Sequence, residues 1–351
     1  MNTKTRFVVI TSALVMGVGL GVGLLAYSVG LPNGAFGRRG GPDELRFLPK
    51  NASLVGYANV HDVMVSDLRQ RAKAMAPGGE RGQEKFQAET GINIETDIDR
   101  VVASFDPGTD GAADLGVVIA TGRFDETRIE ALLRSHGAKV EDYKGRRLIL
   151  LPEDGHDRKA KDADPGDAPA QPRKPRPDGA MAFIQPGTLA IGTAPLVRGA
   201  IDRRAGGENL TDNEDLMKQV RSLESGNAWA VGRFDALGAG HKLPAQVSSQ
   251  LPPITWFSVS GHINGGLRGV LRAETRDDES ANNLRDVLRG FMALAKMQAG
   301  GRPAMQTLLQ SLELGGSGHT VALSFTVPAD ALELLGGPGG ARSPRRGPEE
   351  H

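Results

Sequence analysis

Hydrophobic residues are concentrated first in one uninterrupted run near the start of the chain, residues 7–29 (FVVITSALVMGVGLGVGLLAYSV). The run contains no charged side chain, and as an α-helix it would be long enough to cross the roughly 30 Å hydrocarbon core of a bilayer. Lys4 and Arg6 precede it, which favours a short cytoplasmic tail at residues 1–6. The pattern predicts a single transmembrane helix, with the remainder of the chain exported.

Two further features affect how this segment is interpreted. Ala26 and Ser28 offer the small residues that a signal peptidase needs, so cleavage near Ser28 is the alternative to a retained signal-anchor. The apolar run is longer than that of most signal peptides, which favours the anchor. Gly17 and Gly21 stand four residues apart, a spacing compatible with a homodimer contact, although glycine is also common in membrane helices generally.

Beyond residue 46 short apolar segments alternate with amphipathic ones. Strands are expected at residues 53–60, 101–105, 115–122, 146–151, 181–185, 188–192, 228–234, 255–262, 268–274 and 320–327. Helices are expected at residues 62–75, 125–136, 194–204, 212–223, 278–298, 303–312 and 329–335. This order predicts an α+β fold, with a largely antiparallel sheet and helices packed on one face.

Three polar or Gly/Pro-rich stretches interrupt this alternation. Residues 30–46 predict a flexible stalk, residues 153–179 a disordered charged Pro-rich loop, and residues 336–351 a disordered tail. They divide the exported part into a first α+β half, residues 47–152, and a second α+β half, residues 180–335.

The two halves are similar in layout, and each reads as strand, helix, two strands, helix, strand. Where a strand ends, an Asp repeatedly opens the next segment, as expected of a preferred helix N-cap: Asp62, Asp125, Asp235 and Asp277. We therefore expect that the two halves arose by duplication. The pattern does not distinguish one domain from two.

Short motifs in the first half add a resemblance. They are LPKNASLVGY at residues 48–57, ETGI at residues 89–92 followed by Asp97-Ile98, and GVVI at residues 116–119. Together with the membrane helix they resemble a group of uncharacterised bacterial exported proteins of unknown function, over roughly residues 47–335. The resemblance implies architecture only, and it carries over no functional residues. From the apolar run and its basic flank we expect a single-pass protein of a bacterial inner membrane, with its C-terminal domain in the periplasm.

Composition excludes several classes of protein. The chain has 42 basic and 42 acidic side chains, whereas a nucleic-acid-binding protein normally has a clear basic excess. It has no cysteine, which excludes a disulfide framework, a thiol nucleophile and a cysteine-based metal site.

The residues that could take part in catalysis or metal binding form only weak patterns. His262 and His319 each follow a Ser-Gly pair, but neither accompanies the acid or the nucleophile turn of a Ser-His site. Asp106, Asp110 and Asp114 miss the ligand alternation of a calcium loop and fit a hairpin instead. We therefore predict no catalytic, cofactor-binding or metal-binding residues.

The sequence contains no recognisable catalytic pattern, which favours a binding role over catalysis. We expect a non-catalytic binding or scaffolding module of the cell envelope with a protein partner. Trp229 and Trp256 lie in core-like strands, where burial explains them better than a ligand platform. One alternative is a carrier of an apolar ligand or lipid between helices and sheet, in a cavity lined by Leu284, Leu288, Phe291 and Met297. A third is a hydrolase, which would need a cleft with convergent polar groups of perturbed pKa.

Overall fold

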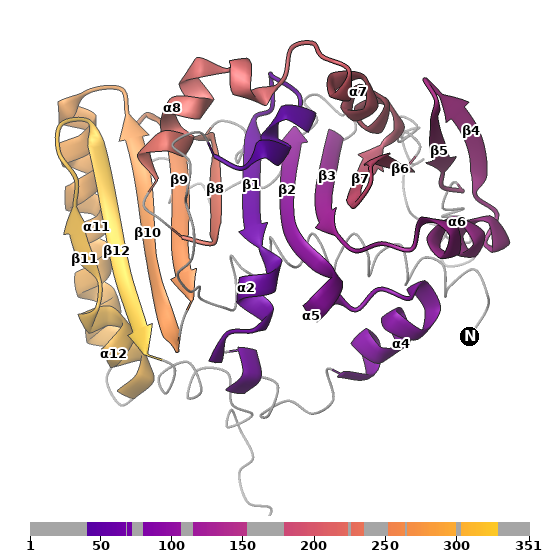
Figure 1. The fold of residues 1–351 in the computed structure, drawn as a ribbon. Coiled ribbons are helices and arrows are strands. Elements are labelled where there is room, and N and C mark those ends of the chain that lie inside the picture. The colour runs from indigo at the N-terminus through magenta and orange to yellow at the C-terminus, as the bar shows by residue number, and fades with distance from the viewer. Residues whose placement is uncertain are drawn as a thin grey trace, which may run out of the picture.

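A computed structural model describes residues 41–67, 69–71, 80–106, 115–152, 179–223, 226–234, 252–263, 265–299 and 303–328. Within these residues the chain forms a mixed α+β fold on one twelve-stranded sheet (Figure 1). Its order is β11-β12-β10-β9-β8-β1-β2-β3-β7-β6-β5-β4, with all neighbours antiparallel. The expectation of an α+β fold with an antiparallel sheet is confirmed. The predicted transmembrane segment, the loop from residue 153 to 178 and the C-terminal tail lie outside the described residues.

The strands are β1 (Leu54–Asn59), β2 (Ile98–Asp106), β3 (Leu115–Gly122), β4 (Lys139–Tyr143), β5 (Arg146–Leu150), β6 (Gly179–Gln185), β7 (Thr188–Thr193), β8 (Ala228–Arg233), β9 (Ile254–Ile263), β10 (Gly266–Thr275), β11 (Glu313–Gly315) and β12 (Thr320–Pro328). The helices are η1 (Asp43–Phe47), α2 (Val60–Met64), α4 (Glu80–Thr90), α5 (Ile94–Asp97), α6 (Glu126–Ser135), α7 (Ala194–Arg204), η2 (Leu210–Asp212), α8 (Glu214–Ser222), α11 (Asp278–Gln298) and α12 (Pro303–Gln310). Every strand expected from the sequence is present, and β4 and β11 are additional. Across the described ranges, each helix falls short of the length and apolarity that a bilayer-crossing helix requires.

The centre of the sheet has a regular order. β1 and β8 pair in the middle, β2 and β3 follow on one side, and β9 and β10 follow on the other. A helix follows each of β3 and β10. The Asp125 carboxylate caps α6 and accepts from the Arg128 N–H at 2.9 Å, and the Asp277 carboxylate caps α11 and accepts from the Ser280 N–H at 2.7 Å. The prediction that Asp62 caps a helix is wrong, because the Asn59 side chain caps α2. The fourth predicted cap, Asp235, lies outside the described residues.

Helices cover both faces of the sheet, which corrects the expectation of one face. One core cluster places α7, α8 and η1 over side chains such as Val102 of β2 and Ala182 of β6. A second cluster places α4 and α6 over the alternate side chains, such as Val101 and Phe183. Successive residues of a strand point to opposite faces. Since β6 is apolar on both, both faces of this end must be covered.

The predicted stalk also ends earlier than expected. Residues 43–47 form η1, in which Leu45 and Phe47 are 0% and 1% exposed, and both belong to the main core cluster. The short motif DELRF contains too few apolar residues for a periodicity to show. Its burial follows from tertiary packing against α7 and η2.

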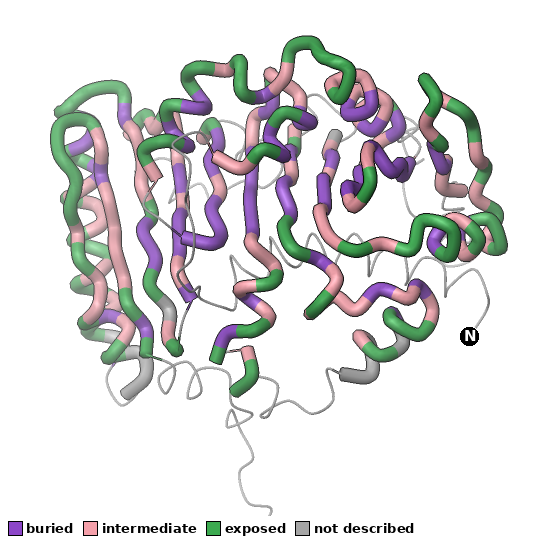
Figure 2. Tube along the Cα trace, viewed as in Figure 1, coloured by how far each residue is buried: buried purple, intermediate pink, exposed green. Residues whose placement is uncertain are grey.

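The β9–β10–β12 end is built differently. Here α11 packs on β10 and β12 through a small cluster centred on Ala281, Leu284 and Val321. Figure 1 shows α11 alongside β12 at this end of the sheet, and Figure 2 shows that the strands there are less buried than those at the centre. The opposite face combines polar side chains, among them Ser258 and Arg272, with apolar ones such as Trp256.

Candidate functional site

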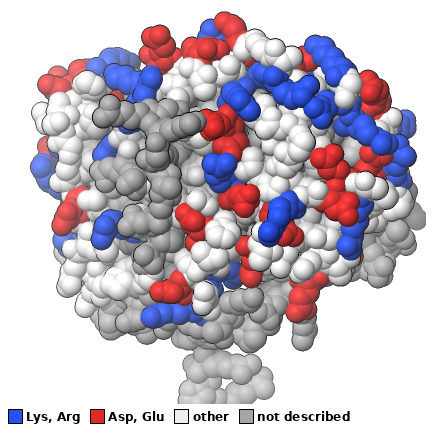
Figure 3. All heavy atoms as spheres, in the orientation of Figure 1, with Lys and Arg blue, Asp and Glu red and all other residues white. Residues whose placement is uncertain are grey.

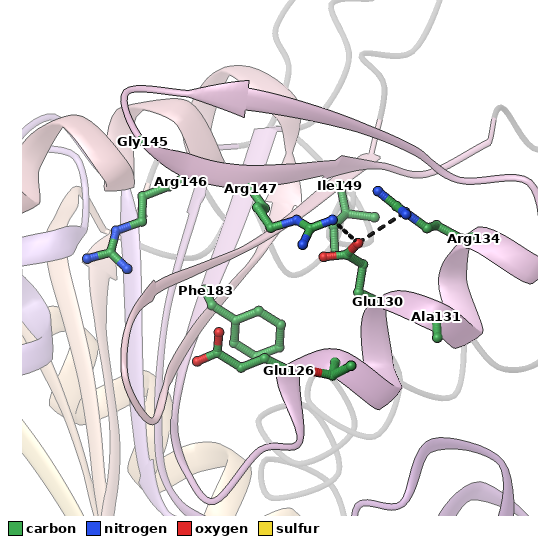
Figure 4. A pocket seen from close by; sticks show the side chains of 10 residues that line it. Glu126, Glu130, Ala131, Arg134, Gly145, Arg146, Arg147, Ile149 and Phe183 are labelled. Carbon is green, nitrogen blue, oxygen red and sulfur yellow. Dashed lines mark hydrogen bonds and ion pairs between the residues drawn. The ribbon is translucent and has the colours of Figure 1, made fainter.

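The larger of the two described clefts, of about 540 Å³, lies between α6 and the β4–β5 hairpin (Figure 4). The hairpin turn is formed by Lys144 and Gly145, whose φ angles of 51° and 72° fit the type I′ turn that matches the twist of paired strands. This tight reversal brings Arg146 and Arg147 to the cleft, opposite the polar side of α6.

Glu130 is the central charged group of the α6 cleft. Its carboxylate accepts from Arg134, one helical turn away at 3.0 Å, and from Arg147 on β5. The Glu130 side chain is only 13% exposed, so both ion pairs are partly shielded from water. Figure 4 shows both guanidinium groups directed at this carboxylate, whereas Arg146 points away from it.

The rest of the α6 cleft combines an apolar floor with a charged rim. Ile149 and Phe183 form the floor and are nearly fully buried. Glu126 and Arg146 add one charge of each sign, and neither has an ion-pair partner within the described part of the chain. The described lining contains no His, Lys or Ser, and therefore no Ser-His or Lys nucleophile of the usual kind. Such a site is suited to holding a segment that carries both charges.

The sequence analysis missed Glu130 and Arg147. Glu130 and Arg134 stand four residues apart on a correctly predicted helix, a spacing that does indicate an ion pair. Arg147 lies on a correctly predicted strand, but its pairing with Glu130 depends on how β5 packs against α6, which the sequence pattern does not show. β4 reads KVEDY and points only Val140 and Tyr143 toward the protein, as expected of a charged edge strand that discourages pairing with other chains.

The weak candidates from the sequence lie apart from the α6 cleft. Asp106 accepts a hydrogen bond from the Ser53 N–H at 2.8 Å, and Asp110 and Asp114 lie outside the described residues. His262 is on β9, and His319 is exposed just before β12. Among described residues, no three His, Asp or Glu side chains are placed to hold a metal ion.

The residues expected to line an apolar carrier cavity are divided between core and surface. Leu284 is 3% exposed and packs with Leu288 in the cluster under α11. Phe291 and Met297 are 46% and 75% exposed. Neither described cleft is lined by any of these four residues.

The two tryptophans have different environments. Trp229 is 3% exposed and stacks on Tyr57, with ring centroids 5.7 Å apart, so its predicted burial is confirmed. Trp256 is only partly buried and lines the second cleft, of about 390 Å³, together with Arg272 and Glu274.

Comparison with known proteins gives little more. No protein-family model matches the chain, and no curated protein matches it. Crystal forms I and III of TP0453, a Treponema protein, align with 84% of this chain and with 96% and 98% of their own. Identity is 8% in both, and the TM-scores are 0.43 and 0.46. A likeness at this level carries no inference about function.

Proposed function

We propose that this protein is a non-catalytic binding module of the bacterial envelope, anchored in the inner membrane by residues 7–29 with its α+β part in the periplasm. The observation that supports binding best is the α6 cleft, in which Glu130 is held by two guanidinium groups over an apolar floor. Charges fixed in this way favour recognition, because they are already oriented before a partner arrives. The partner that fits is a protein segment with charges of both signs.

The surface charge agrees with such a partner. Lys and Arg side chains lie intermixed with Asp and Glu on the face in Figure 3. A surface of mixed sign does not attract nucleic acid over a distance. Specificity would then come from local pairing, such as between Arg146 or Glu126 and opposite charges on the partner.

Site-specific photo-crosslinking in living cells tests the partner. A photoreactive amino acid replaces Arg146 in the full-length chain, and a matched control replaces the exposed Lys218 on α8. We expect one defined polypeptide to crosslink from position 146, to be absent from position 218, and to be reduced by Glu130→Ala. Equal crosslinking from both positions would reject the α6 cleft as the partner site.

The anchor is tested separately by membrane fractionation. Carbonate-resistant association of a full-length chain with an intact N-terminus supports the signal-anchor, whereas a mature chain starting near Ser28 supports cleavage. Gly17→Leu and Gly21→Leu should reduce dimerisation of the anchored protein if these glycines form a helix contact. Unchanged dimerisation in both variants would remove the homodimer proposal.

We also propose that the exported part is a duplication. The supporting observation is that β1–β2–β3–α6 and β8–β9–β10–α11 extend outward from the central β1–β8 pair in the same order. Both following helices pack on the same face of the sheet, because Val101 under α6 and Ala273 under α11 belong to that face by strand register. Both halves contribute to one sheet, which favours a single folding unit. One cooperative unfolding transition for the whole chain would be expected, and two separate transitions would contradict it.

A further inference from the structure

The second cleft has a floor made of neighbouring positions on three strands. Strand register places Trp256, Glu274 and Thr320 in one row, and Ser258, Arg272 and Ala322 in the next. Cross-strand neighbours on one face lie about 5 Å apart, so the six side chains form a compact surface. An aromatic ring, both signs of charge and two hydroxyls therefore meet in one small area.

Two other elements wall this sheet cleft. On one side is the last turn of α8, with Gln219 and Ser222, and on the other is the turn between β11 and β12, with Gly316 and Ser317. Gly316 has a φ of 94°, and a Cβ there would overlap the Thr320 carbonyl oxygen, so only glycine allows this turn to close. The wall is thus fixed by the backbone.

Several polar side chains of the sheet cleft have no hydrogen-bond partner in the part of the chain that the structure describes. Gln219 and Ser258 are only 6% and 4% exposed. No hydrogen bond within the described residues satisfies the Gln219 amide, the Ser258 hydroxyl or the Glu274 carboxylate. Although the residues are largely buried, their unpaired polar atoms are accessible from the cleft, where a ligand could supply the missing hydrogen bonds. In the α6 cleft, by contrast, the buried carboxylate is paired.

Other groups of the sheet cleft are already held in position. Arg272 donates to the Ser222 carbonyl oxygen, and the Ser222 hydroxyl donates to the Gln219 carbonyl oxygen at 2.7 Å. These bonds tie β10 to the end of α8 and fix the guanidinium beside the open groups. The unpaired donors and acceptors therefore have a rigid frame.

We infer that this sheet cleft binds a neutral saccharide. An amide, a carboxylate and a hydroxyl together accept and donate several hydrogen bonds, as the adjacent hydroxyl groups of a sugar require. Arg272 and Glu274 sum to no net charge, which gives no preference for an anionic or cationic ligand. The partly buried Trp256 offers an aromatic surface to the apolar side of a sugar ring. The volume of about 390 Å³ lies in the range of small-molecule sites.

The test uses the full-length protein in a detergent without a sugar headgroup. Maltose, cellobiose and N,N′-diacetylchitobiose are titrated while tryptophan fluorescence and heat of binding are recorded. The chain has two tryptophans, so Trp229→Phe isolates the signal of Trp256. We expect at least one of these disaccharides to change the Trp256 emission with saturation, and glucose 6-phosphate to bind more weakly.

Variants separate a ligand site from a structural feature. Gln219→Leu and Glu274→Gln should each weaken binding about tenfold or more, as expected for hydrogen bonds to an oriented ligand. Gln219→Leu should not lower the melting temperature, because the Gln219 amide makes no hydrogen bond within the described residues. Gln310→Leu and Glu313→Gln, at exposed positions on α12 and β11, are the matched controls and should leave binding unchanged.

Three results would overturn the inference. The first is the absence of a response to any of the disaccharides at about 10 mM, a weak limit that corresponds to a binding free energy of roughly −3 kcal/mol. The second is an unchanged affinity in both Gln219→Leu and Glu274→Gln. The third is tighter binding of glucose 6-phosphate than of every neutral sugar. Trp256 also packs against the main core, so the test does not depend on replacing it. The sheet cleft is separate from the α6 cleft, and its test stands independently of the proposed protein partner.

Discussion

The two ends of the sheet differ in how they are covered. At the β6 end, Ala182 lies under α7 and Phe183 lies over α6 on the other face, so both faces are buried. At the β10 end α11 covers one face through a small cluster, and the other face carries Arg272 and Glu274 beside the buried Ser258 and Val270. β6 accordingly reads GAMAFIQ, whereas β10 reads GLRGVLRAET and carries Arg268, Arg272 and Glu274 on one face. The pattern of a strand therefore reports the number of layers around it.

The two clefts continue this difference. In the α6 cleft, next to the doubly covered end, the buried carboxylate of Glu130 is satisfied by Arg134 and Arg147. In the sheet cleft, at the β10 end, the side chains of Gln219 and Ser258 have no hydrogen bond within the described residues, and their polar atoms are accessible from the cleft. A charge paired within the protein is held in one orientation, whereas an unpaired polar group at a cleft surface is open to a ligand's hydrogen bonds. The two clefts are therefore expected to bind different kinds of molecule: a charged protein segment at the α6 cleft and a neutral ligand at the sheet cleft.

The largest effect is expected from introducing a charge at the two ends. Ala182→Asp places a carboxylate at a site of zero exposure between two apolar layers, and we expect a loss of about 5 kcal/mol or more, enough to prevent folding. Ala322→Asp lies beside Arg272 in the sheet cleft and should change the free energy of unfolding by less than about 1 kcal/mol. Urea unfolding followed by circular dichroism measures both. Similar losses in the two variants would contradict the difference between the ends.

The strand pattern also explains how far the fold could be predicted. Strands such as β3 and helices such as α11 were placed correctly because their periodicity runs over many residues. β4 and η1 were missed, since a charged edge strand and a five-residue 3₁₀ helix have no such period. The single-face arrangement was wrong because α7 and α8 do not reveal from sequence alone which face they cover. Both clefts depend on pairings between distant segments, such as Glu130 with Arg147, which one sequence does not display.

The next largest effect concerns η1, which joins the covered end. Phe47→Ala removes a ring that is 1% exposed, and we expect a loss of about 3–5 kcal/mol. Arg46→Ala, its exposed neighbour in the same element, removes only the guanidinium that lies 4.8 Å from the Phe47 ring centroid and should lose less than about 1 kcal/mol. Chemical denaturation gives both values. A small effect of Phe47→Ala would mean that the stalk extends through η1.

The pH dependence of the free energy of unfolding should show how well the centre of the sheet is shielded from water. Burial raises the pKa of Tyr57 from 10.0 to about 12, opposed by Arg100 and reinforced by Glu44 and Asp62. Below pH 10 the ring is protonated whether folded or not, so it adds no pH dependence. Between pH 10 and 12 only the unfolded chain releases the proton, and stability should fall by about 2 kcal/mol in total. In Tyr57→Phe this decrease in stability between pH 10 and 12 should be absent, while the aromatic contact with Trp229 is kept. If the variant and the parent protein lose stability equally over this pH range, the burial of the Tyr57 hydroxyl is contradicted.

The smallest effect concerns the paired cleft and decides whether its charges stabilise the fold. A double-mutant cycle on Glu130 and Arg147 should give a coupling energy of about 1 kcal/mol, because the carboxylate is only 13% exposed although Arg147 is 60% exposed. The exposed pair Asp286 and Arg289, on α11 at the other end, should give about 0–0.5 kcal/mol in the same cycle. Thermal unfolding of the four variants of each pair supplies the values. If the coupling at Glu130 is no larger than at Asp286, the α6 cleft is an open surface whose ions are free to reorganise. Its charges would then be as available to a partner as those of the sheet cleft, and the contrast between the two ends would rest on strand burial alone.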